Sequence, residues 1–380
     1  MKHIYYIGQY SDTNNSRNLR FQPSAITKMN YVLYALKKAN YKVHIFSPAE
    51  TSNTFFCYYS KEKIIVDDSE SITYINTIGG PTLLLKALSR IWTMLQLSFF
   101  LIIEVKQFDK ILVYHNLLYK WPIKIAMIFK KLDLYFEVEE LYHAVQESSF
   151  TKIQKEIKYL QKANGYILVN DLIAEKCRFV NKPTAVCYGD YRMTSIVKGS
   201  FYDENIHLVY AGLIDESGSD VYLSLETMCY LPTNYRLHIL GYGVSKNINL
   251  IKRRIDDLNS SFGFESIIYQ GCLSGNKYYT FLSKCDIGLC TRVLIDEYSD
   301  YTFPSKVLLY LGNNLIPICS PITSVINSQV SNYVVFSNDI TPQSIADSVL
   351  YIQEKQIIAS ESILNSLDEN FVKSLILLFD

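Results

Sequence analysis

The chain has 380 residues, of which 49% are hydrophobic, so it can fill the cores of two domains of ordinary size. Lysine plus arginine and aspartate plus glutamate both number 37, which excludes a strong net field that would attract nucleic acid. The eight cysteines form no CxxC pair and no zinc-like cluster with histidine, which indicates buried thiols in a reducing compartment.

The first half of the chain alternates short strand-like runs with helical ones. Helical periodicity covers Thr27 to Asn40 and resumes near Trp121 and near Ser149. The strand-like runs between these helices are HIYYIG, KVHIFS, ITYINTI, KILVYHN, LDLYFEV and GYILVN. This alternation is typical of a parallel sheet with helices on both faces, and it predicts a Rossmann-like, doubly wound domain over residues 1–186.

One apolar segment of the first half, Ile91 to Ile103, bears on where the protein resides. Thirteen residues are too few to cross a bilayer as a helix, which takes about 20 residues. The segment predicts a buried or half-buried helix, with a helix that also touches a membrane surface as the alternative. The N-terminus, MKHIYYIGQYSD, lacks a signal-peptide pattern. We therefore expect a cytoplasmic protein, with the inner face of the membrane as the second location.

The alternation of strands and helices starts afresh after the stretch NKPTAVCYGDY, which ends at Tyr191. It predicts a second Rossmann-like domain over residues 187–355 and a C-terminal helix, within 356–380, that packs back across the domain junction. The strands of this second series are IHLVYAG, YRLHILGYG, ESIIYQG and DIGLC. A ligand is expected in a cleft between the two sheets, at the carboxyl ends of their strands.

The run YTFPSKVLLYLGNNLIPI, from Tyr301 to Ile318, places a lysine where a helix begins. Phe303 and Pro304 favour an extended approach, and Ser305 is a good helix N-cap. Lys306 then lies in the first turn, where the helix dipole disfavours a cation. A bound anion such as phosphate would remove this conflict, while a lysine that points into water is the structural alternative.

This FPSK run resembles the donor-site segment of glycosyltransferases related to family 4, which have the GT-B fold. Further likenesses occur in the same order as in that family, from about Ile4 to Ser320: YFEVEELYH after VYHN, GYILVNDLI, AVCYGDY, LHILGYG and YQGCLSGNKYYTFLSKCDIGLC. The first-half likenesses are to a bacterial subgroup that builds surface polysaccharides. The resemblance implies an enzyme that moves a sugar from a nucleoside-diphosphate sugar to a saccharide or lipid-linked saccharide, with retention of anomeric configuration.

The resemblance also implies a donor site in the second domain. Lys306 and the helix start at Ser305 would hold the diphosphate, with Arg292 as a further candidate, and glycines would let the backbone approach the nucleoside. The full set of expected donor-binding residues is Gly212, Gly241, Gly243, Gly271, Leu273, Phe303, Pro304, Ser305 and Lys306. No acidic motif has a convincing metal context, so we expect metal-independent transfer that uses the sugar nucleotide as co-substrate and no cofactor.

Polar residues that follow strands of the first domain are the acceptor-side candidates. His115 ends the VYHN run and is assigned, with Lys306, a catalytic role at the transferred sugar, although a hydrogen-bonded strand-end histidine is equally expected. Glu137, Glu139 and Glu140 follow the next strand, where they are a base, an acceptor ligand or an acidic helix start. Arg17 and Arg20 are candidate contacts to an anionic acceptor, or surface arginines.

Two departures from the family pattern keep other functions open. Members of the family commonly carry two glutamates eight positions apart around this helix, where this chain has Tyr301 and Leu309. The loop that supplies basic residues in many relatives is the acidic LIDESGSD here. The alternatives are a non-catalytic homologue that binds sugar nucleotide or glycan as the partner of an active transferase, and a sugar-nucleotide epimerase.

Overall fold

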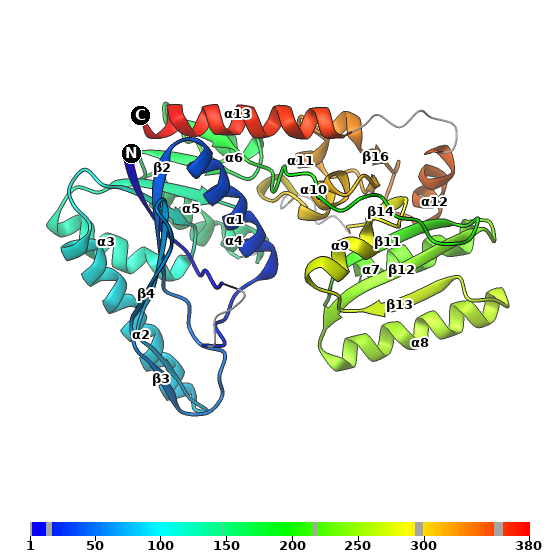
Figure 1. The fold of residues 1–380 in the computed structure, drawn as a ribbon, viewed down its shortest axis with the longest axis horizontal. Helices are drawn as coiled ribbons and strands as arrows, with labels where there is room; N and C mark the ends of the chain where they lie inside the picture. Colours follow the sequence, from blue (N-terminus) through cyan, green and yellow to red (C-terminus); the bar gives the residue numbers. More distant parts are fainter. Residues whose placement is uncertain (1, 13–16, 147, 216–218, 293–298, 353–359) are drawn as a thin grey trace. The chain divides into compact units, whose positions relative to one another are not determined.

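The computed structural model describes residues 2–12, 17–146, 148–215, 219–292, 299–352 and 360–380. The chain divides into two compact units, each built on its own sheet (Figure 1). Unit 1 comprises Met1–Gly189 and Asp368–Asp380, and unit 2 comprises Asp190–Leu367. Both units are Rossmann-like α/β structures, so the predicted fold class is confirmed.

Unit 1 contains an eight-stranded sheet. Its strands are added first on one side of β1 and then, from β7 onward, on the other side. Strand β1 pairs in parallel with β2 on one side and with β7 on the other. The point where the order reverses, between β1 and β7, is where a doubly wound sheet opens a crevice at its carboxyl edge. In sheet order the strands are β10 (Thr184–Val186), β9 (Gly165–Leu168), β8 (Asp133–Val138), β7 (Lys110–Tyr114), β1 (Lys2–Ile7), β2 (Tyr41–Ser47), β5 (Glu70–Tyr74) and β4 (Glu62–Asp67).

The edge of this sheet differs from the all-parallel arrangement that the sequence predicted. Strand β4 pairs antiparallel with β5, and a separate two-stranded ribbon joins β3 (Cys57–Tyr59) to β6 (Thr77–Gly79). Strand β4 is largely exposed on both faces. Its sequence, EKIIVD, has charged residues at both ends and lacks the continuous apolar run that a buried parallel strand needs. The predicted strand ITYINTI is divided between β5 and β6.

Helices cover the strands of unit 1, and one of them leaves a long apolar face in solvent. Helix α2 (Leu83–Phe99) continues into a π-helical turn (Phe100–Glu104), so it is longer than the apolar run predicted. Among the described residues, this stretch has the length and composition to cross a membrane, and its most apolar 18 residues are 33% buried. The other helices of the unit are α1 (Pro23–Lys38), α3 (Lys120–Phe129), α4 (Tyr142–Val145), α5 (Phe150–Leu160), α6 (Leu172–Lys176) and the C-terminal part of α13 (Glu361–Phe379).

Unit 2 contains a six-stranded sheet whose described pairings are all parallel. Strand β11 lies beside both β12 and β14, so the winding reverses between β11 and β14. This reversal places a second crevice at the carboxyl edge of unit 2. In sheet order the strands are β13 (Ile267–Gly271), β12 (Tyr235–Gly243), β11 (Ile206–Ile214), β14 (Ile287–Cys290), β15 (Ile316–Cys319) and β16 (Val335–Phe336).

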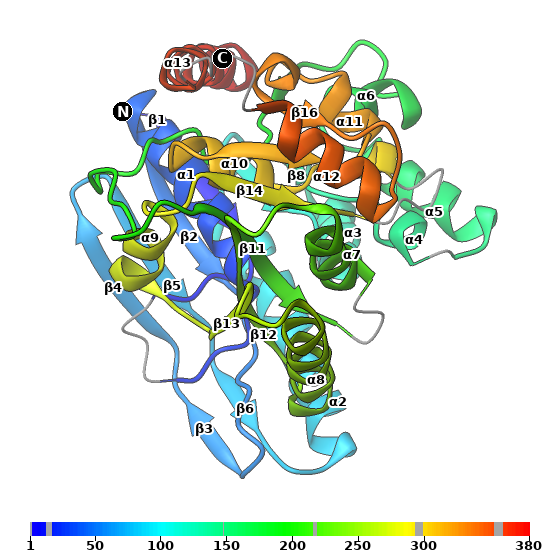
Figure 2. The same ribbon diagram turned by 90° about the vertical axis from the view of Figure 1, so that its right-hand side faces the viewer.

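Helices lie on both faces of the unit 2 sheet (Figure 2). Helices α7 (Ser219–Thr227), α8 (Ser245–Phe262) and α12 (Pro342–Tyr351) pack apolar side chains against β11 and β12 on one face. Helices α9 (Gly275–Leu282) and α10 (Ser305–Gly312) lie on the other, and the short α11 (Thr323–Ile326) follows β15. The core of the first face consists mainly of aliphatic residues, with Tyr210 and Tyr235, that alternate along the strands because successive side chains point to opposite faces.

Helix α10 is fixed to the sheet by Tyr310, whose side chain is fully buried. Its ring packs on Gly288 so closely that a Cβ at that glycine would lie 2.2 Å from the ring. The Tyr310 hydroxyl accepts a hydrogen bond from the Ala211 N–H at 3.1 Å and donates one to the Leu289 carbonyl at 3.1 Å. It therefore satisfies one backbone group on each of β11 and β14, just beyond the last pair that these strands form.

We expect Tyr310→Phe to lower the free energy of unfolding by about 1–3 kcal/mol, because it leaves a buried N–H and a buried carbonyl without a partner. Urea denaturation followed by circular dichroism measures this change. Tyr230→Phe is the matched control, since Tyr230 is 50% exposed, and it should change the unfolding free energy by no more than about 0.5 kcal/mol. Equal stability of the two variants would contradict the assigned role of the Tyr310 hydroxyl.

Candidate functional site

Two of the predicted donor residues of unit 2, Gly212 and Lys306, meet where β11 and β14 separate. These two strands pair only at Leu208–Ile287 and Val209–Gly288, and β11 then continues to Ile214 beside β12. Gly212 lies on the stretch of β11 that pairs with β12 but no longer with β14, and Lys306 on α10 reaches it. The sequence prediction that these residues belong together is therefore consistent with their positions within unit 2.

Lys306 crosses the end of β11 above an aromatic ring. Its Nζ lies 3.7 Å from the centre of the Tyr210 ring, which is a close cation–π contact. Burial lowers the pKa of Lys306. The nearby Tyr210, Cys290 and Asp220 together raise it by more, so the pKa lies above its ordinary value. The half-buried ammonium therefore stays charged at neutral pH, beside the crevice of the sheet.

We call the region around Lys306 and the end of β11 the half-site of unit 2, and the region around Glu137, Glu139 and Lys28 the half-site of unit 1. Most of the predicted glycines of unit 2 are required for packing rather than for the approach of a ligand. A Cβ at Gly212 would lie 2.7 Å from Lys306 Cε, so a larger residue there would displace the end of the lysine side chain. A Cβ at Gly241 would meet the Ile214 side chain at 2.7 Å, and one at Gly243 would meet the Ile214 carbonyl oxygen at 2.3 Å. Gly271 differs, because it has a φ of +77° with open space around its Cα. Of the expected glycines, Gly271 is the one whose surroundings leave space for a ligand.

The FPSK segment differs from its prediction in one detail. Helix α10 begins at Ser305, but Pro304 occupies the N-cap position and no side chain caps the helix. The predicted N-cap role of Ser305 is wrong by one residue, which leaves the exposed Ser305 hydroxyl in the first turn beside Lys306. Phe303 is buried, so it anchors the approach to the helix, while Pro304 and Leu273 are half-buried.

Arg292 and a pair of cysteines border Lys306. The Arg292 Nη1 donates to Thr302 Oγ1 at 3.2 Å, and its backbone N–H donates to Ser320 Oγ at 3.0 Å. Cys290 and Cys319 are paired across β14 and β15, and the hydrogen bond between their thiols lowers the pKa of Cys290. Two cations and the first turn of α10 thus lie at one edge of unit 2, which is a setting suited to an anion. Within the acidic LIDESGSD loop, residues 216–218 lie outside the described residues.

A buried acidic cluster occupies the crevice of unit 1, between β1 and β7. Glu137, at the end of β8, is fully buried and accepts a hydrogen bond from the Tyr6 hydroxyl of β1. Glu139 lies 3.2 Å from Nζ of Lys28, which is itself buried and also donates to the Cys187 carbonyl. Lys28 thus neutralises this cluster from α1, and Glu140 beside it is half-buried.

The two carboxyl groups of this cluster differ in protonation. Burial and the neighbouring Glu139 raise the pKa of Glu137 to about 8, so it holds a proton at neutral pH. Burial also raises the pKa of Glu139, while Lys28 opposes that rise. Glu137 Oε1 has no hydrogen-bond donor among the described residues, whereas Glu139 Oε1 lies 3.2 Å from the Lys28 ammonium. Such a pair can accept or release a proton at a strand end.

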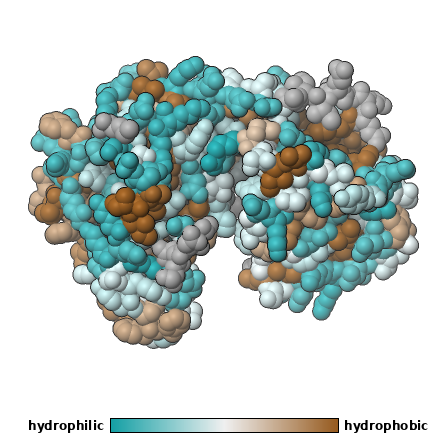
Figure 3. Space-filling view, viewed as in Figure 1, coloured by the Kyte–Doolittle hydropathy of each residue, from teal (hydrophilic) through white to brown (hydrophobic). Residues whose placement is uncertain are grey.

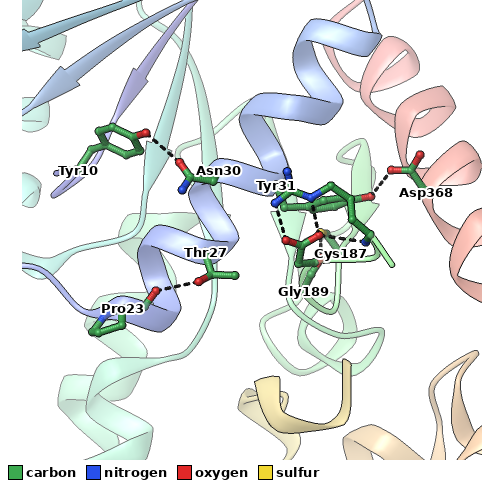
Figure 4. Close-up of polar contacts among 10 residues, drawn as sticks. Tyr10, Pro23, Thr27, Asn30, Tyr31, Cys187, Gly189 and Asp368 are labelled. Atoms are coloured by element: carbon green, nitrogen blue, oxygen red, sulfur yellow. Dashed lines mark hydrogen bonds and ion pairs between the residues drawn. The ribbon is translucent and has the colours of Figure 1, made fainter. Parts of the chain in front are cut away.

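Helix α1 holds together the segments that surround this cluster. Cys187 and Gly189, which follow β10, lie beside the helix, where the Cys187 thiol donates to the Gly189 carbonyl at 3.3 Å (Figure 4). Tyr31, on the same helix, donates to Asp368 Oδ1 of α13 at 2.8 Å. Helix α1, which carries Lys28, is therefore bonded both to the segment that follows β10 and to the C-terminal helix α13.

His115 does not occupy the open position that the sequence suggested. Its side chain is only 1% exposed, and its Nε2 lies 2.7 Å from Glu156 Oε1 in the interior of unit 1. Glu156 also accepts the N–H groups of Tyr142 and His143. Burial raises the pKa of Glu156, but His115 and then these two N–H groups lower it by more, so the pKa lies below its ordinary value. The hydrogen-bonded strand-end alternative describes His115 better, and direct contact with a sugar is not supported by its burial.

The two predicted arginines have different surroundings. Arg17 is 5% exposed, and its guanidinium donates to the carbonyls of Ser60 and Ile75 and to Glu62. Its prediction as an acceptor contact is contradicted, because these bonds fix the 57–77 segment instead. Arg20 is exposed and lines a cavity of about 100 Å³ together with Lys86 and Arg90 of unit 1.

Several residues of the two half-sites were missed in the sequence. Lys28 and Tyr6 lie within apolar helix and strand patterns that favour a core role. Tyr210 and Tyr310 were likewise hidden among 31 tyrosines. The lysine inside an otherwise buried helical face of α1 was the one available signal, because a lysine is rarely buried without a partner.

Comparison with known proteins supports the fold and no closer relationship. No family model matches the chain, and no curated protein sequence matches it. Among solved structures, trehalose-6-phosphate synthase from E. coli bound with UDP-2-fluoro glucose has a TM-score of 0.70 at 9% identity. The match covers 100% of this chain and 97% of that one.

Two further trehalose-phosphate synthases give similar values. The UDP-forming enzyme from Burkholderia xenovorans, in complex with glucose-6-phosphate, has a TM-score of 0.68 at 9% identity, with 100% of this chain and 98% of that chain covered. The enzyme from Burkholderia vietnamiensis has a TM-score of 0.66 at 10% identity, with coverage of 100% and 96%. The chain therefore has the GT-B fold, while the resemblance to family 4 in particular receives no support from these structures.

The raised pKa of Glu137 predicts a specific pH dependence of stability. An acid whose folded pKa lies above its unfolded value stabilises the fold at low pH, and this contribution is lost as pH rises from about 4.5 to about 8. In the unmodified chain, Glu137 should make the free energy of unfolding fall by up to roughly 1 kcal/mol per pH unit over that range, and Glu137→Gln should abolish this fall. Urea denaturation at a series of pH values measures the difference.

The matched control for this measurement is Glu175→Gln, at an exposed glutamate of the same unit. It should leave the pH dependence as it is in the original protein. A pH profile of Glu137→Gln that runs parallel to that of the unmodified chain would show that Glu137 does not hold a proton in the folded state.

Proposed function

We propose that this chain is a glycosyltransferase that moves a sugar from a nucleoside-diphosphate sugar to a saccharide acceptor. The observation that carries the proposal is the position of Lys306, which lies charged at the split between β11 and β14 in a GT-B fold. Solved neighbours of this fold include a UDP-forming synthase and a complex with UDP-2-fluoro glucose, so UDP-sugars are the first donors to test.

Transfer requires that the departing diphosphate be stabilised as the bond to the sugar breaks. Lys306 is suited to this task, because its ammonium is fixed over Tyr210 and needs no reorganisation to meet a developing negative charge. The first turn of α10 and Arg292 add positive potential at the same edge. We propose that these groups act without a metal ion and without a cofactor.

The acceptor must lose a proton as its oxygen bonds to the sugar. In unit 1, Glu139 is the carboxylate best placed to accept a hydrogen bond from an acceptor hydroxyl, because its side chain is 19% exposed while Glu137 is fully buried. Lys28 keeps it anionic at 3.2 Å. The acceptor proton then leaves with the diphosphate or passes to this carboxylate pair. Retention of configuration remains part of the proposal.

The biological setting follows from the family 4 resemblance. We propose bacterial surface-polysaccharide synthesis, in the cytoplasm or at the inner face of the membrane, with a lipid-linked saccharide as one class of acceptor. A sugar phosphate is the other class, since one solved neighbour is in complex with glucose-6-phosphate. Arg20 and the cavity that it lines offer basic groups for either kind of phosphate.

A non-catalytic function is the second candidate, because Tyr301 and Leu309 stand where relatives carry glutamates. Tyr301 lies in a 3-10 turn and Leu309 on α10, so neither position supplies a carboxylate to hold the ribose hydroxyls of a donor. A binding protein of this kind would retain nucleotide affinity without turnover. Detection of UDP released from a donor, in the presence of mixed saccharide acceptors, separates the two candidates.

We expect Lys306→Ala to raise the Kd for the bound sugar nucleotide by one to two orders of magnitude, on the scale of a lost charge-assisted contact of roughly 1.5–3 kcal/mol. Isothermal titration calorimetry with UDP-, GDP- and dTDP-sugars, with Mg²⁺ and with a chelator, measures the affinity and its dependence on metal.

Lys252→Ala provides a matched control, because Lys252 also lies over a tyrosine ring, that of Tyr269 at 5.1 Å, but on the outer side of α8. Its removal should leave the Kd unchanged. An unaltered Kd in Lys306→Ala would remove Lys306 from the donor site, and no binding of any donor by the unmodified chain would overturn the proposed function.

A further inference from the structure

Helix α2 presents most of its large apolar side chains to solvent and mainly small polar ones to the protein. The exposed set recurs at helical spacing and forms one continuous face: Leu84, Leu88, Ile91, Trp92, Leu95 and Phe99. The side chains that α2 buries are Ser89, Thr93, Leu97 and Ser98. A helix of a soluble domain has the opposite arrangement, since its apolar stripe faces the core.

The neighbouring helix extends this apolar surface. Helix α3 packs against α2 and exposes Trp121 (63%), Ile128 (79%) and Phe129 (68%). Phe108, in the loop before β7, is 87% exposed. We call these residues of α2, α3 and Phe108 the apolar face of unit 1. Other apolar side chains gather on the surface of the same unit (Figure 3).

Both tryptophans of the chain, Trp92 and Trp121, lie on this face. Tryptophan has an apolar ring and one polar N–H, so it is favoured at the boundary between lipid and water. The ammonium of Lys124 lies 5.4 Å from the Trp121 ring, which places a cation beside an interfacial aromatic side chain. A contiguous exposed patch that contains both tryptophans indicates an interaction site, whereas singly exposed leucines do not.

The charge of this segment differs from that of the whole chain. Residues 83–131 contain eight lysines and arginines but only two acids, a net charge of +6 in a chain whose total is zero. The cations are Lys86, Arg90, Lys106, Lys110, Lys120, Lys124, Lys130 and Lys131, and the acids are Glu104 and Asp109. Three of these charges are paired outside the segment, Glu104 with Lys61, Arg90 with Glu50 and Lys110 with Asp133, and the other cations retain the positive excess. A surface that combines apolar side chains with positive charge is complementary to an anionic lipid surface.

The connections of α2 favour a helix that lies on a membrane over one that crosses it. The helix follows β6 and leads through the turn Phe100–Glu104 into β7 of the main sheet, so both of its ends return to unit 1. Phe100 and Leu101 of that turn are buried, and Phe100 stacks on Phe46 of β2 at 3.9 Å. Since one side of α2 is packed on the unit, only the other side is available to lipid.

We propose that the apolar face of unit 1 docks on the surface of a membrane that contains anionic lipids. The exposed side chains of α2 and α3 enter the boundary between headgroups and acyl chains, and the lysines contact the headgroup phosphates. The docking surface consists of residues that are separate from Lys306 and Glu139, so its existence does not rest on the proposed transfer reaction.

Flotation of the full-length protein with vesicles tests this docking. We expect binding to vesicles of equal parts phosphatidylcholine and phosphatidylglycerol, weak binding to phosphatidylcholine alone, and release by high salt. Because both tryptophans lie on the face, their emission should shift to the blue when anionic vesicles are added. Absence of binding to either vesicle type, or equal binding to both, would overturn the proposal.

Two sets of substitutions separate the apolar and the charged contributions. Leu88→Asp with Leu95→Asp should lower vesicle partitioning at least about tenfold, since it removes two leucines from the lipid boundary. Lys120→Gln, Lys124→Gln and Lys131→Gln together should also lower it at least about tenfold, but only for anionic vesicles. The matched control is Leu250→Asp with Leu377→Asp, at exposed leucines on α8 and α13, and it should bind as the unmodified protein does.

Light scattering on the same proteins tests the competing occupant, a second copy of this chain. A doubled mass that is lost in the Leu88→Asp and Leu95→Asp variant, without vesicle binding by the unmodified protein, would assign the face to self-association and overturn membrane docking. Circular dichroism verifies that each variant is folded, which is expected because the substituted side chains are exposed or half-buried.

Discussion

The separation of β11 from β14 is the constraint on which the rest of unit 2 depends. Parallel strands that diverge leave a buried N–H and a buried carbonyl without partners, and Tyr310 supplies both hydrogen bonds from α10. Because Lys306 precedes Tyr310 by four residues, it projects from the same side of the helix and reaches β11 at Gly212. One tyrosine hydroxyl therefore bonds both diverging strands and fixes the helix that carries Lys306.

At the corresponding place in its sheet, unit 1 buries two neighbouring carboxyl groups. The carboxyl groups of Glu137 and Glu139 lie in an interior that disfavours two negative charges, so one group holds a proton and the other is paired with Lys28. Lys28 in turn depends on the Cys187 carbonyl, from a segment on the far side of the sheet order. A basic half-site in one unit and an acidic one in the other match the two demands of sugar transfer, which are a stabilised diphosphate and an acceptor that loses its proton.

The apolar face of unit 1 has a physical basis of its own. Small polar side chains along the buried side of α2 let the helix lie close to the unit, while its exposed leucines, Ile91 and Trp92 stay in contact with solvent. That exposure is unfavourable in water, because each large aliphatic side chain forgoes about 1.5–3 kcal/mol of burial. Docking on a lipid surface would recover part of this free energy and would bring an acceptor that is itself attached to lipid close to unit 1.

The sequence by itself determined the alternation of strands and helices, the two-domain α/β architecture and the start of α10, because periodicity and local turn residues encode them within a few neighbouring positions. Tertiary structure alone decided which polar residues meet. Lys28 and Cys187 are 159 positions apart, and His115 and Glu156 are 41 apart, so no local pattern links them. For the same reason Arg17 and His115, polar residues next to predicted strand ends, proved to be buried and bonded within unit 1, and β4 joined the sheet antiparallel at its edge. Burial and pairing depend on segments that folding brings together, and those contacts follow from the path of the whole chain.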